Sequence, residues 1–224
     1  MQLYVMTVQQ YPGFITSDEA DRILGWLKDQ PYTKEKFAPT ANSNDVNVLH
    51  YRNKNIDFHL DGSLVRQIVY PKLSDIMADP CATHGAFLES HYPFSLHVDT
   101  VKTFDSKNFT AISDESNNRA VLIALNESTD FQTVFFDFYT DDIDQSYANI
   151  PELIPELPVP VYDKINDLSH LPNRARNLLA YHSINQAQGV TWQKGMALTW
   201  SRQQLHCSSN FYHKGIKQAL VLFF

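Results

Sequence analysis

The pattern of apolar and polar positions divides the chain into a helical first part and a β-rich remainder. From Gly85 onward, short segments rich in β-branched and aromatic residues alternate with polar turns. These segments are GAFLES (85–90), PFSLHVD (93–99), RAVLIALN (119–126) and FQTVFFDFY (131–139). Such runs are typical of antiparallel sandwiches and barrels, and strands are expected again from about Val190. We therefore predict a mainly β protein with flanking helices and a double-stranded β-helix (jelly-roll, cupin-like) core.

The first thirty residues predict a strand followed by a helix. Residues 3–8 are expected to form the strand, and residues 16–19 (TSDE) have the capping-box form that begins a helix. Ile23, Leu24 and Leu27 make one apolar face, which core packing explains better than a cofactor site. Pro31 is expected to end this helix.

A second helix is predicted further along this part of the chain. Residues 32–45 are polar and loop-like, whereas residues 46–52 alternate as a strand would. Residues 61–63 (DGS) can cap a helix over 64–77, in which Pro71 predicts a kink or a break. We expect these N-terminal helices to pack on the β core.

The predicted sheets are interrupted by a proline-containing segment, residues 141–190. Its prolines exclude long regular structure from much of the segment; they are Pro151, Pro155, Pro158, Pro160 and Pro172. Insertions of roughly fifty residues are usually lids or binding loops. We expect one domain over residues 1–224 that carries this insertion.

Composition narrows the classes of partner and compartment. The net charge of -7, without a Lys/Arg cluster, argues against nucleic-acid binding. No apolar run reaches the roughly 18 residues of a membrane span, and the first residues lack the pattern of a signal peptide. Cys81 and Cys207 are too few for a disulfide framework. A cytoplasmic protein that does not bind membranes is the expectation.

The last stretch, residues 196–224, is predicted to form two short strands joined by a polar turn. His206 lies on the first and Lys217 opens the second, eleven residues later. A matching pair of residues, His97-Val98-Asp99, lies upstream. Because side chains at i and i+2 of a strand share a face, His97 and Asp99 can reach one ion, with His206 brought alongside. Two imidazoles and one carboxylate form the facial triad of non-haem Fe(II) oxygenases.

A second His-x-Asp pair, His59-Leu60-Asp61, is the alternative for the metal pair. Asp61 precedes Gly-Ser and a predicted helix, so an N-cap role explains it. We therefore prefer His97 and Asp99.

The order His97-x-Asp99, distal His206 and a basic residue on the final strand resembles that of the Fe(II)/2-oxoglutarate-dependent dioxygenases. The closing stretch is most similar to the phytanoyl-CoA dioxygenase branch, in which a small Ser-containing turn follows the distal His and an Arg stands eleven positions on. Here the turn is Cys207-Ser208-Ser209, and Lys217 replaces the Arg. The resemblance implies Fe(II) on the triad and 2-oxoglutarate as cosubstrate, with its distal carboxylate on Lys217.

For the other candidate residues around the cosubstrate, a purely structural role is the alternative. Tyr92 and Ser208 could donate to its carboxylate, or could be a core tyrosine and a plain turn residue. Lys217 could be a charge that guards a strand edge. Lys214, in the predicted turn, is the alternative anchor, and Arg119 and Arg202 are further cations. Two groups are expected to be structural: Trp192 and Trp200 in the core, and His91, His182 and His213 at ordinary positions.

The resemblance implies an oxygenase that hydroxylates a small molecule or peptide with release of succinate and CO2. Two rival hypotheses are a jelly-roll binding module without chemistry and a cupin metalloenzyme that does not use 2-oxoglutarate. Metal analysis discriminates the first rival, and 2-oxoglutarate-dependent succinate formation discriminates the second. The insertion at 141–190 and the polar segment 100–118 are the candidates for enclosing the substrate.

Overall fold

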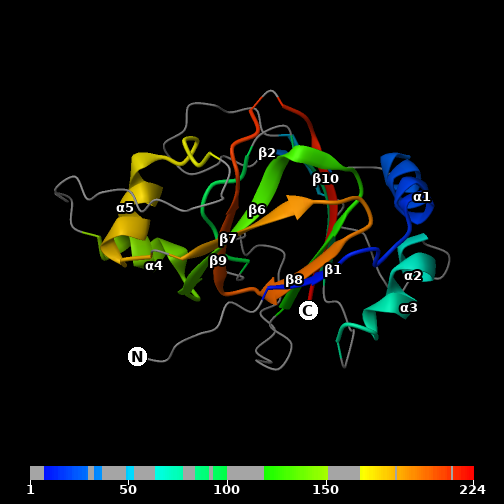
Figure 1. The fold of residues 1–224 in the computed structure, drawn as a ribbon, viewed down its shortest axis with the longest axis horizontal. Coiled ribbons are helices and arrows are strands. Elements are labelled where there is room, and N and C mark those ends of the chain that lie inside the picture. The colour runs from blue at the N-terminus through cyan, green and yellow to red at the C-terminus, as the bar shows by residue number, and fades with distance from the viewer. Residues whose placement is uncertain are drawn as a thin grey trace.

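The computed structural model is built on two antiparallel β-sheets that face each other (Figure 1). The predicted mainly β architecture is therefore confirmed. The structure describes residues 8–29, 33–36, 49–52, 64–77, 84–90, 93–99, 119–150, 167–184, 186–212 and 214–224. None of the described helices is long and apolar enough to cross a membrane.

The larger sheet has five strands in the order β1-β8-β5-β10-β4, and the smaller has three in the order β7-β6-β9. The larger sheet contains β1 (Gln9–Tyr11), β4 (His84–Ser90), β5 (Arg119–Ala124), β8 (Ala197–Ser201) and β10 (Lys217–Phe223). The smaller sheet contains β6 (Ser128–Tyr139), β7 (Ala187–Trp192) and β9 (Gln204–Ser208). All pairings within both sheets are antiparallel.

The interior between the two sheets follows from strand alternation. On β10, Ala219, Val221 and Phe223 belong to the cluster between the sheets, and the residues between them face outward. The smaller sheet contributes Phe135, Val190 and Trp192 to this interior. Side chains from distant parts of the chain therefore converge in one apolar space, next to which the polar site residues lie.

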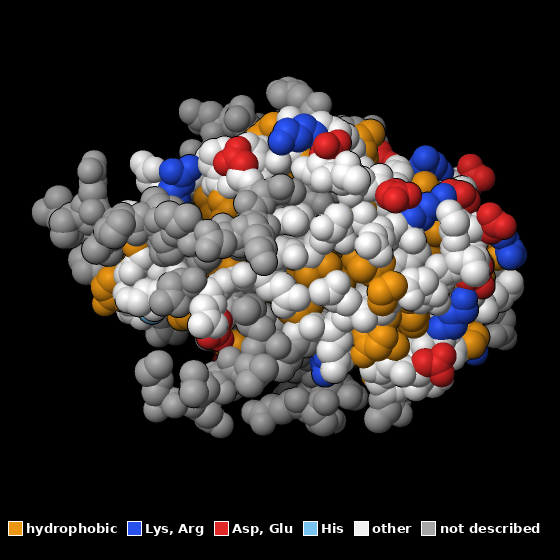
Figure 2. All heavy atoms as spheres, viewed as in Figure 1, with side chains coloured by type: hydrophobic (Ala, Val, Ile, Leu, Met, Phe, Trp, Pro, Cys, Tyr) orange, Lys and Arg blue, Asp and Glu red, His pale blue; other side chains and the backbone are white. Residues whose placement is uncertain are grey.

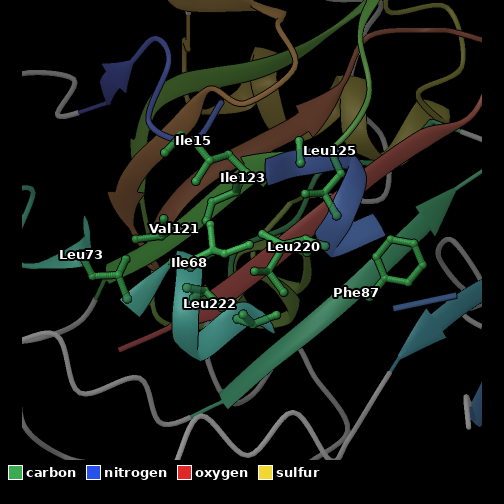
Figure 3. Close-up of a cluster of buried hydrophobic side chains, with 14 of the residues drawn as sticks. Ile15, Ile68, Leu73, Phe87, Val121, Ile123, Leu125, Leu220 and Leu222 are labelled. Carbon is green, nitrogen blue, oxygen red and sulfur yellow. The ribbon is translucent and has the colours of Figure 1, made fainter. Parts of the chain in front are cut away.

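The N-terminal helices cover the outer face of the larger sheet, as predicted (Figure 3). They are α1 (Ser17–Lys28), α2 (Leu64–Ile68) and α3 (Tyr70–Leu73). Leu220 and Leu222 of β10 meet Ile68 and Leu73 of these helices in one buried cluster. Burying each such side chain contributes about 1.5–3 kcal/mol.

Local signals in the sequence set the ends of these helices. Thr16 caps α1 by accepting from the Glu19 amide at 3.2 Å, and Glu19 Oε2 accepts from the Thr16 amide at 2.7 Å. This capping box was predicted. The expected break at Pro71 is also found, because α2 ends at Ile68 and α3 has Pro71 in its first turn.

Two further helices, α4 (Ile143–Ala148) and α5 (Asn173–Tyr181), lie within residues 141–190. Ile143 and Leu178 share a buried cluster with Val134, Leu205 and Cys207, which face outward from the smaller sheet. The described helices of this segment are therefore packed on the sheet.

Three details differ from the sequence prediction. Residues 33–36, expected to be loop, form strand β2 (Thr33–Lys36), which pairs with β3 (Leu49–Arg52). Backbone pairing with β3 overrides the polar character of β2. Residues 93–99 form a single β-bridge and not a regular strand.

The third difference is that residues 196–224 form three strands, β8, β9 and β10, where two were expected. The turn between β8 and β9 is Arg202-Gln203, which carries no Gly, Pro, Asn or Asp to mark it. Residues 1–7, which include most of the predicted first strand, and residues 61–63, the predicted cap of the second helix, lie outside the described residues.

Charged side chains of both signs are interspersed on the face shown in Figure 2, mainly where α1 and α3 lie. Two ion pairs from this region are Lys72–Glu19 and Lys194–Asp21, both at 2.6 Å. The visible charge therefore makes a solvated surface over the helices.

Candidate metal centre

Three predicted ligands, His97, Asp99 and His206, come together in the structure. Their ligand atoms all lie within 4.8 Å of one another. His206 belongs to β9 of the smaller sheet, and His97 and Asp99 belong to the segment that bridges to it. Asp99 and His206 are buried, and His97 is partly exposed. The preferred His-x-Asp pair therefore converges with the distal histidine; His59 and Asp61 lie outside the described residues.

Backbone hydrogen bonds set the register of this convergence. His97 and His206 each donate an amide hydrogen to the other's carbonyl at 3.0 Å. The Asp99 amide donates to the Arg202 carbonyl at 2.7 Å, and the Ser208 amide donates to the Phe94 carbonyl at 3.1 Å. Residues 93–99 thus run beside β9 with irregular pairing, and the ligands meet without a regular ladder.

Backbone carbonyls orient both imidazoles through Nδ1. Nδ1 of His97 lies 2.8 Å from the Ser95 carbonyl, and Nδ1 of His206 lies 2.8 Å from the Gln204 carbonyl. A carbonyl oxygen can only accept, so Nδ1 carries the proton in both rings. Nε2 is then the nitrogen with a lone pair, and this is the arrangement of metal-ligating histidines.

The Asp99 carboxylate is fixed by a tryptophan. Nε1–H of Trp200 donates to Asp99 Oδ2 at 3.0 Å, and the same oxygen lies 3.5 Å from His206 Nε2. Arg202 Nε donates to the Asp99 backbone carbonyl at 2.9 Å. Sequence reasoning had assigned Trp200 to the core, which it also joins. Nothing in the sequence pattern distinguishes a core indole from one that donates to a ligand.

Burial controls the protonation of the triad. Desolvation, together with the neighbouring His206, lowers the pKa of His97 to about 4. Desolvation likewise lowers the pKa of His206 to about 4. The pKa of Asp99 is raised by burial, against the opposing influence of His97 and Arg202. Both imidazoles are therefore neutral at pH 7, as metal ligands must be.

Lys217 lies inside the protein near the triad. Its side chain is 4% exposed, and its ammonium lies 4.6 Å from the ring centre of Trp192 and 5.9 Å from that of Phe94. Its hydrogen bond goes to Thr133 Oγ1 at 3.3 Å, and no described carboxylate forms an ion pair with it. Desolvation lowers the pKa of Lys217 to about 8.

Two hydroxyl groups lie beside each other on the interior face of the smaller sheet. Thr133 of β6 is paired in register with Ser208 of β9, two residues from His206. Both side chains are buried, and Ser208 Oγ has no hydrogen-bond partner in the part of the chain that the structure describes. The structure therefore places Ser208 near the candidate anchor, and adds Thr133, which sequence reasoning missed because a lone Thr in a strand carries no signal.

The other predicted candidates lie away from Lys217 or outside the described residues. Lys214 is exposed in the turn before β10. Arg119, the first residue of β5, donates to Gln9 and Thr199, and Arg202 Nε donates to the Asp99 backbone carbonyl. Cys207 belongs to the cluster on the outward face of the smaller sheet, away from the triad, and burial raises the pKa of its thiol. Tyr92 is outside the described residues.

The donor set fits a divalent iron ion. Two neutral Nε2 atoms and one carboxylate are available at mutually short distances, and both rings are held by their other nitrogen. Three protein ligands leave positions open for other molecules. The arrangement can hold a metal ion that also binds further ligands.

Comparison with known proteins identifies the fold. No family model and no curated protein sequence matches the chain. The non-heme α-ketoglutarate dependent carbocyclase SnoK from nogalamycin biosynthesis matches with a TM-score of 0.59 at 11% identity, covering 97% of this chain and 78% of that one. HygX from Streptomyces hygroscopicus, solved with nickel and 2-oxoglutarate bound, matches at 0.55 and 11% identity, with 97% and 82% covered.

A prolyl-4-hydroxylase from Pseudomonas putida matches with a TM-score of 0.50 at 8% identity, covering 98% of this chain and 92% of that one. The chain therefore has the double-stranded β-helix fold of 2-oxoglutarate-dependent oxygenases. Its His-Asp-His triad resembles their iron-binding facial triad. The likeness does not single out the phytanoyl-CoA dioxygenase branch, which stays a prediction.

Proposed function

We propose that this protein is an Fe(II)- and 2-oxoglutarate-dependent oxygenase. The observation that carries the proposal is a buried cation, Lys217, which lies in the same interior as the triad and has no anionic partner among the described residues. An ammonium removed from water is costly unless it is paired. A dicarboxylate that reached from the triad to Lys217 would supply the missing partner.

The residues around Lys217 fit a carboxylate. Ser208 Oγ is a buried donor that lacks a partner among the described residues, and Thr133 Oγ1 already contacts the ammonium. The rings of Trp192 and Phe94 flank the ammonium and keep water from it. Charge-assisted hydrogen bonds in such a site contribute about 1.5–3 kcal/mol each.

The triad would hold the iron. His97, Asp99 and His206 would bind the ion, with Nδ1 of each imidazole held by a backbone carbonyl. Bound iron would supply the redox chemistry that couples O2 and 2-oxoglutarate to oxidation of a substrate C–H bond, with succinate and CO2 as co-products. The chain's own residues orient the ligands, neutralise the distal carboxylate and exclude water.

The substrate is proposed to be a small molecule or a peptide, and the reaction a hydroxylation. The structural neighbours named above include a carbocyclase and a prolyl hydroxylase, so one fold serves different outcomes. The net charge of -7 favours such substrates over nucleic acid. We further propose a cytoplasmic location, and residues 141–190 and 100–118 as the enclosure of the substrate.

Succinate formation tests this function. Purified protein with Fe(II), O2 and 2-oxoglutarate should release succinate slowly without substrate and faster with a suitable one. A panel of small metabolites, lipids and peptides should be screened for this stimulation. Metal binding without any 2-oxoglutarate binding or turnover would favour the cupin metalloenzyme. Absence of metal binding would favour a binding module.

A further inference from the structure

Trp200 contacts the candidate metal centre from a strand that carries none of the three ligands. It lies on β8 of the larger sheet, whereas His206 lies on β9 of the smaller sheet. Its side chain is fully buried, and its indole N–H donates to Asp99 Oδ2 at 3.0 Å. The position of Asp99 therefore depends on the larger sheet, whereas His206 lies on the smaller sheet.

The same indole also packs against a second ligand. The Trp200 and His206 ring centres lie 5.2 Å apart with planes at 62°, an edge-to-face contact. Phe135 completes the group: its ring centre lies 5.2 Å from that of Trp200 and 5.7 Å from that of His206. Trp200 thus limits both the rotation of the Asp99 carboxylate and the tilt of the His206 ring.

We propose that Trp200 is a positioning residue for the metal, whose indole hydrogen bond holds Asp99 in the orientation that binds the ion. The inference rests on the proposed function. Hydrogen bonds to ligating carboxylates are worth about 10- to 100-fold in metal affinity. Without the indole N–H, Asp99 Oδ2 would lose its donor, and the carboxylate could rotate away from the histidines.

Trp192 provides a matched control. It is as buried as Trp200 and belongs to the same interior cluster. Its indole N–H donates to Asn126 Oδ1 at 3.2 Å, and its ring lies against Lys217. Substitution by Phe removes the same atoms at both positions, so a purely structural role predicts the same effect from Trp192→Phe and Trp200→Phe.

The experiment compares metal binding by the wild-type chain and the two variants. Mn(II) affinity is measured by electron paramagnetic resonance, and the ligand field is measured by the visible spectrum of bound Co(II). Trp200→Phe should weaken Mn(II) binding by about 10- to 100-fold and change the Co(II) spectrum. Trp192→Phe should stay within about threefold of the wild type, with an unchanged Co(II) spectrum.

Equal Mn(II) affinities and equal Co(II) spectra in the two variants would overturn the positioning role and leave the proposed function standing. A wild-type protein that binds no metal would overturn both. If Trp200→Phe does not fold, the wild-type protein still gives an answer, because each of its three tryptophans contributes one indole N–H signal in NMR. Zn(II) should shift the Trp200 signal and leave that of Trp26, on α1, in place; an unshifted Trp200 signal contradicts the inference.

Discussion

His97 and His206 exchange two backbone hydrogen bonds of 3.0 Å each, and their ring centres lie 4.1 Å apart. This single bridge brings residues more than a hundred positions apart into one site. It also places a ring nitrogen of each histidine within 4.8 Å of an Asp99 carboxylate oxygen. Backbone pairing therefore brings the ligands of the candidate metal centre together.

Removal of any triad ligand should abolish tight metal binding. For His97→Ala, Asp99→Ala or His206→Ala we expect Mn(II) affinity to fall by more than about 100-fold, since even outer partners of a ligand are worth about 10- to 100-fold. Isothermal titration with Mn(II) measures this loss. His182→Ala, on a histidine that packs against Phe138, is the control and should retain affinity. Full metal occupancy in the His97→Ala/Asp99→Ala double variant would direct attention to His59 and Asp61.

The stability of the metal-free protein should fall at acidic pH. Burial lowers the pKa of His97 and of His206 to about 4, whereas an unfolded histidine has a pKa near 6.5. Between these values the unfolded state binds more protons, so the unfolding free energy decreases as the pH falls. Each histidine contributes at most about 1.4 kcal/mol per pH unit in this window.

Urea unfolding with a chelator present measures this pH dependence. The control is His97→Asn/His206→Asn, whose unfolding free energy should change less between about pH 6.5 and about pH 4. Identical pH profiles for the wild type and the double variant would show that these histidines are not buried as neutral rings.

Ligand binding should protect residues 141–190 from proteolysis. Asp167 and His170 lie just before α5 and attach this segment to the site. The Asp167 carbonyl accepts from the Asn210 amide at 2.7 Å, and His170 Nε2 donates to the Phe94 carbonyl at 3.1 Å. The Phe94 ring contacts both His97 and the Lys217 ammonium. Occupancy of the triad and of Lys217 should therefore stabilise this docking and slow cleavage within 141–190.

Limited proteolysis with and without Mn(II) plus 2-oxoglutarate checks that coupling. His170→Ala should weaken the protection, because it removes the contact to Phe94. Unchanged cleavage rates with every ligand tried would argue against an enclosing role for this segment.

The fold could be predicted because its strands carry strong local signals. The segments 119–126 and 131–139 predicted β5 and β6, and the capping box at Thr16 predicted the start of α1. Strand β2 was missed because Thr33–Lys36 is polar and depends on pairing with β3. The turn at Arg202-Gln203 was missed because it lacks turn-forming residues. Both strand β2 and this turn are determined by strand pairing in the folded protein and not by local sequence.

The ligands of the site could be predicted because the pair His97-x-Asp99 is followed by a distal histidine, His206, and then by a basic residue on the last strand. The residues that hold these ligands in place could not be predicted. Trp200 and Thr133 have ordinary residue types for buried strands, and their roles arise from which side chains the two sheets bring opposite each other. Lys217 was preferred over Lys214 from its place at the start of a strand, and the structure buries the first and exposes the second.

Binding of 2-oxoglutarate to the Mn(II)-loaded protein, followed by isothermal titration calorimetry, tests the central claim most directly. Because a charge-assisted hydrogen bond contributes about 1.5–3 kcal/mol and each 1.4 kcal/mol is tenfold in affinity, Lys217→Ala should weaken binding by roughly 10- to 100-fold. Lys217→Ala should keep its Mn(II) affinity, Lys217→Arg should retain part of the 2-oxoglutarate affinity, and Lys214→Ala should match the wild type. Unchanged 2-oxoglutarate affinity in Lys217→Ala, or no binding by the metal-loaded wild type, would contradict the account.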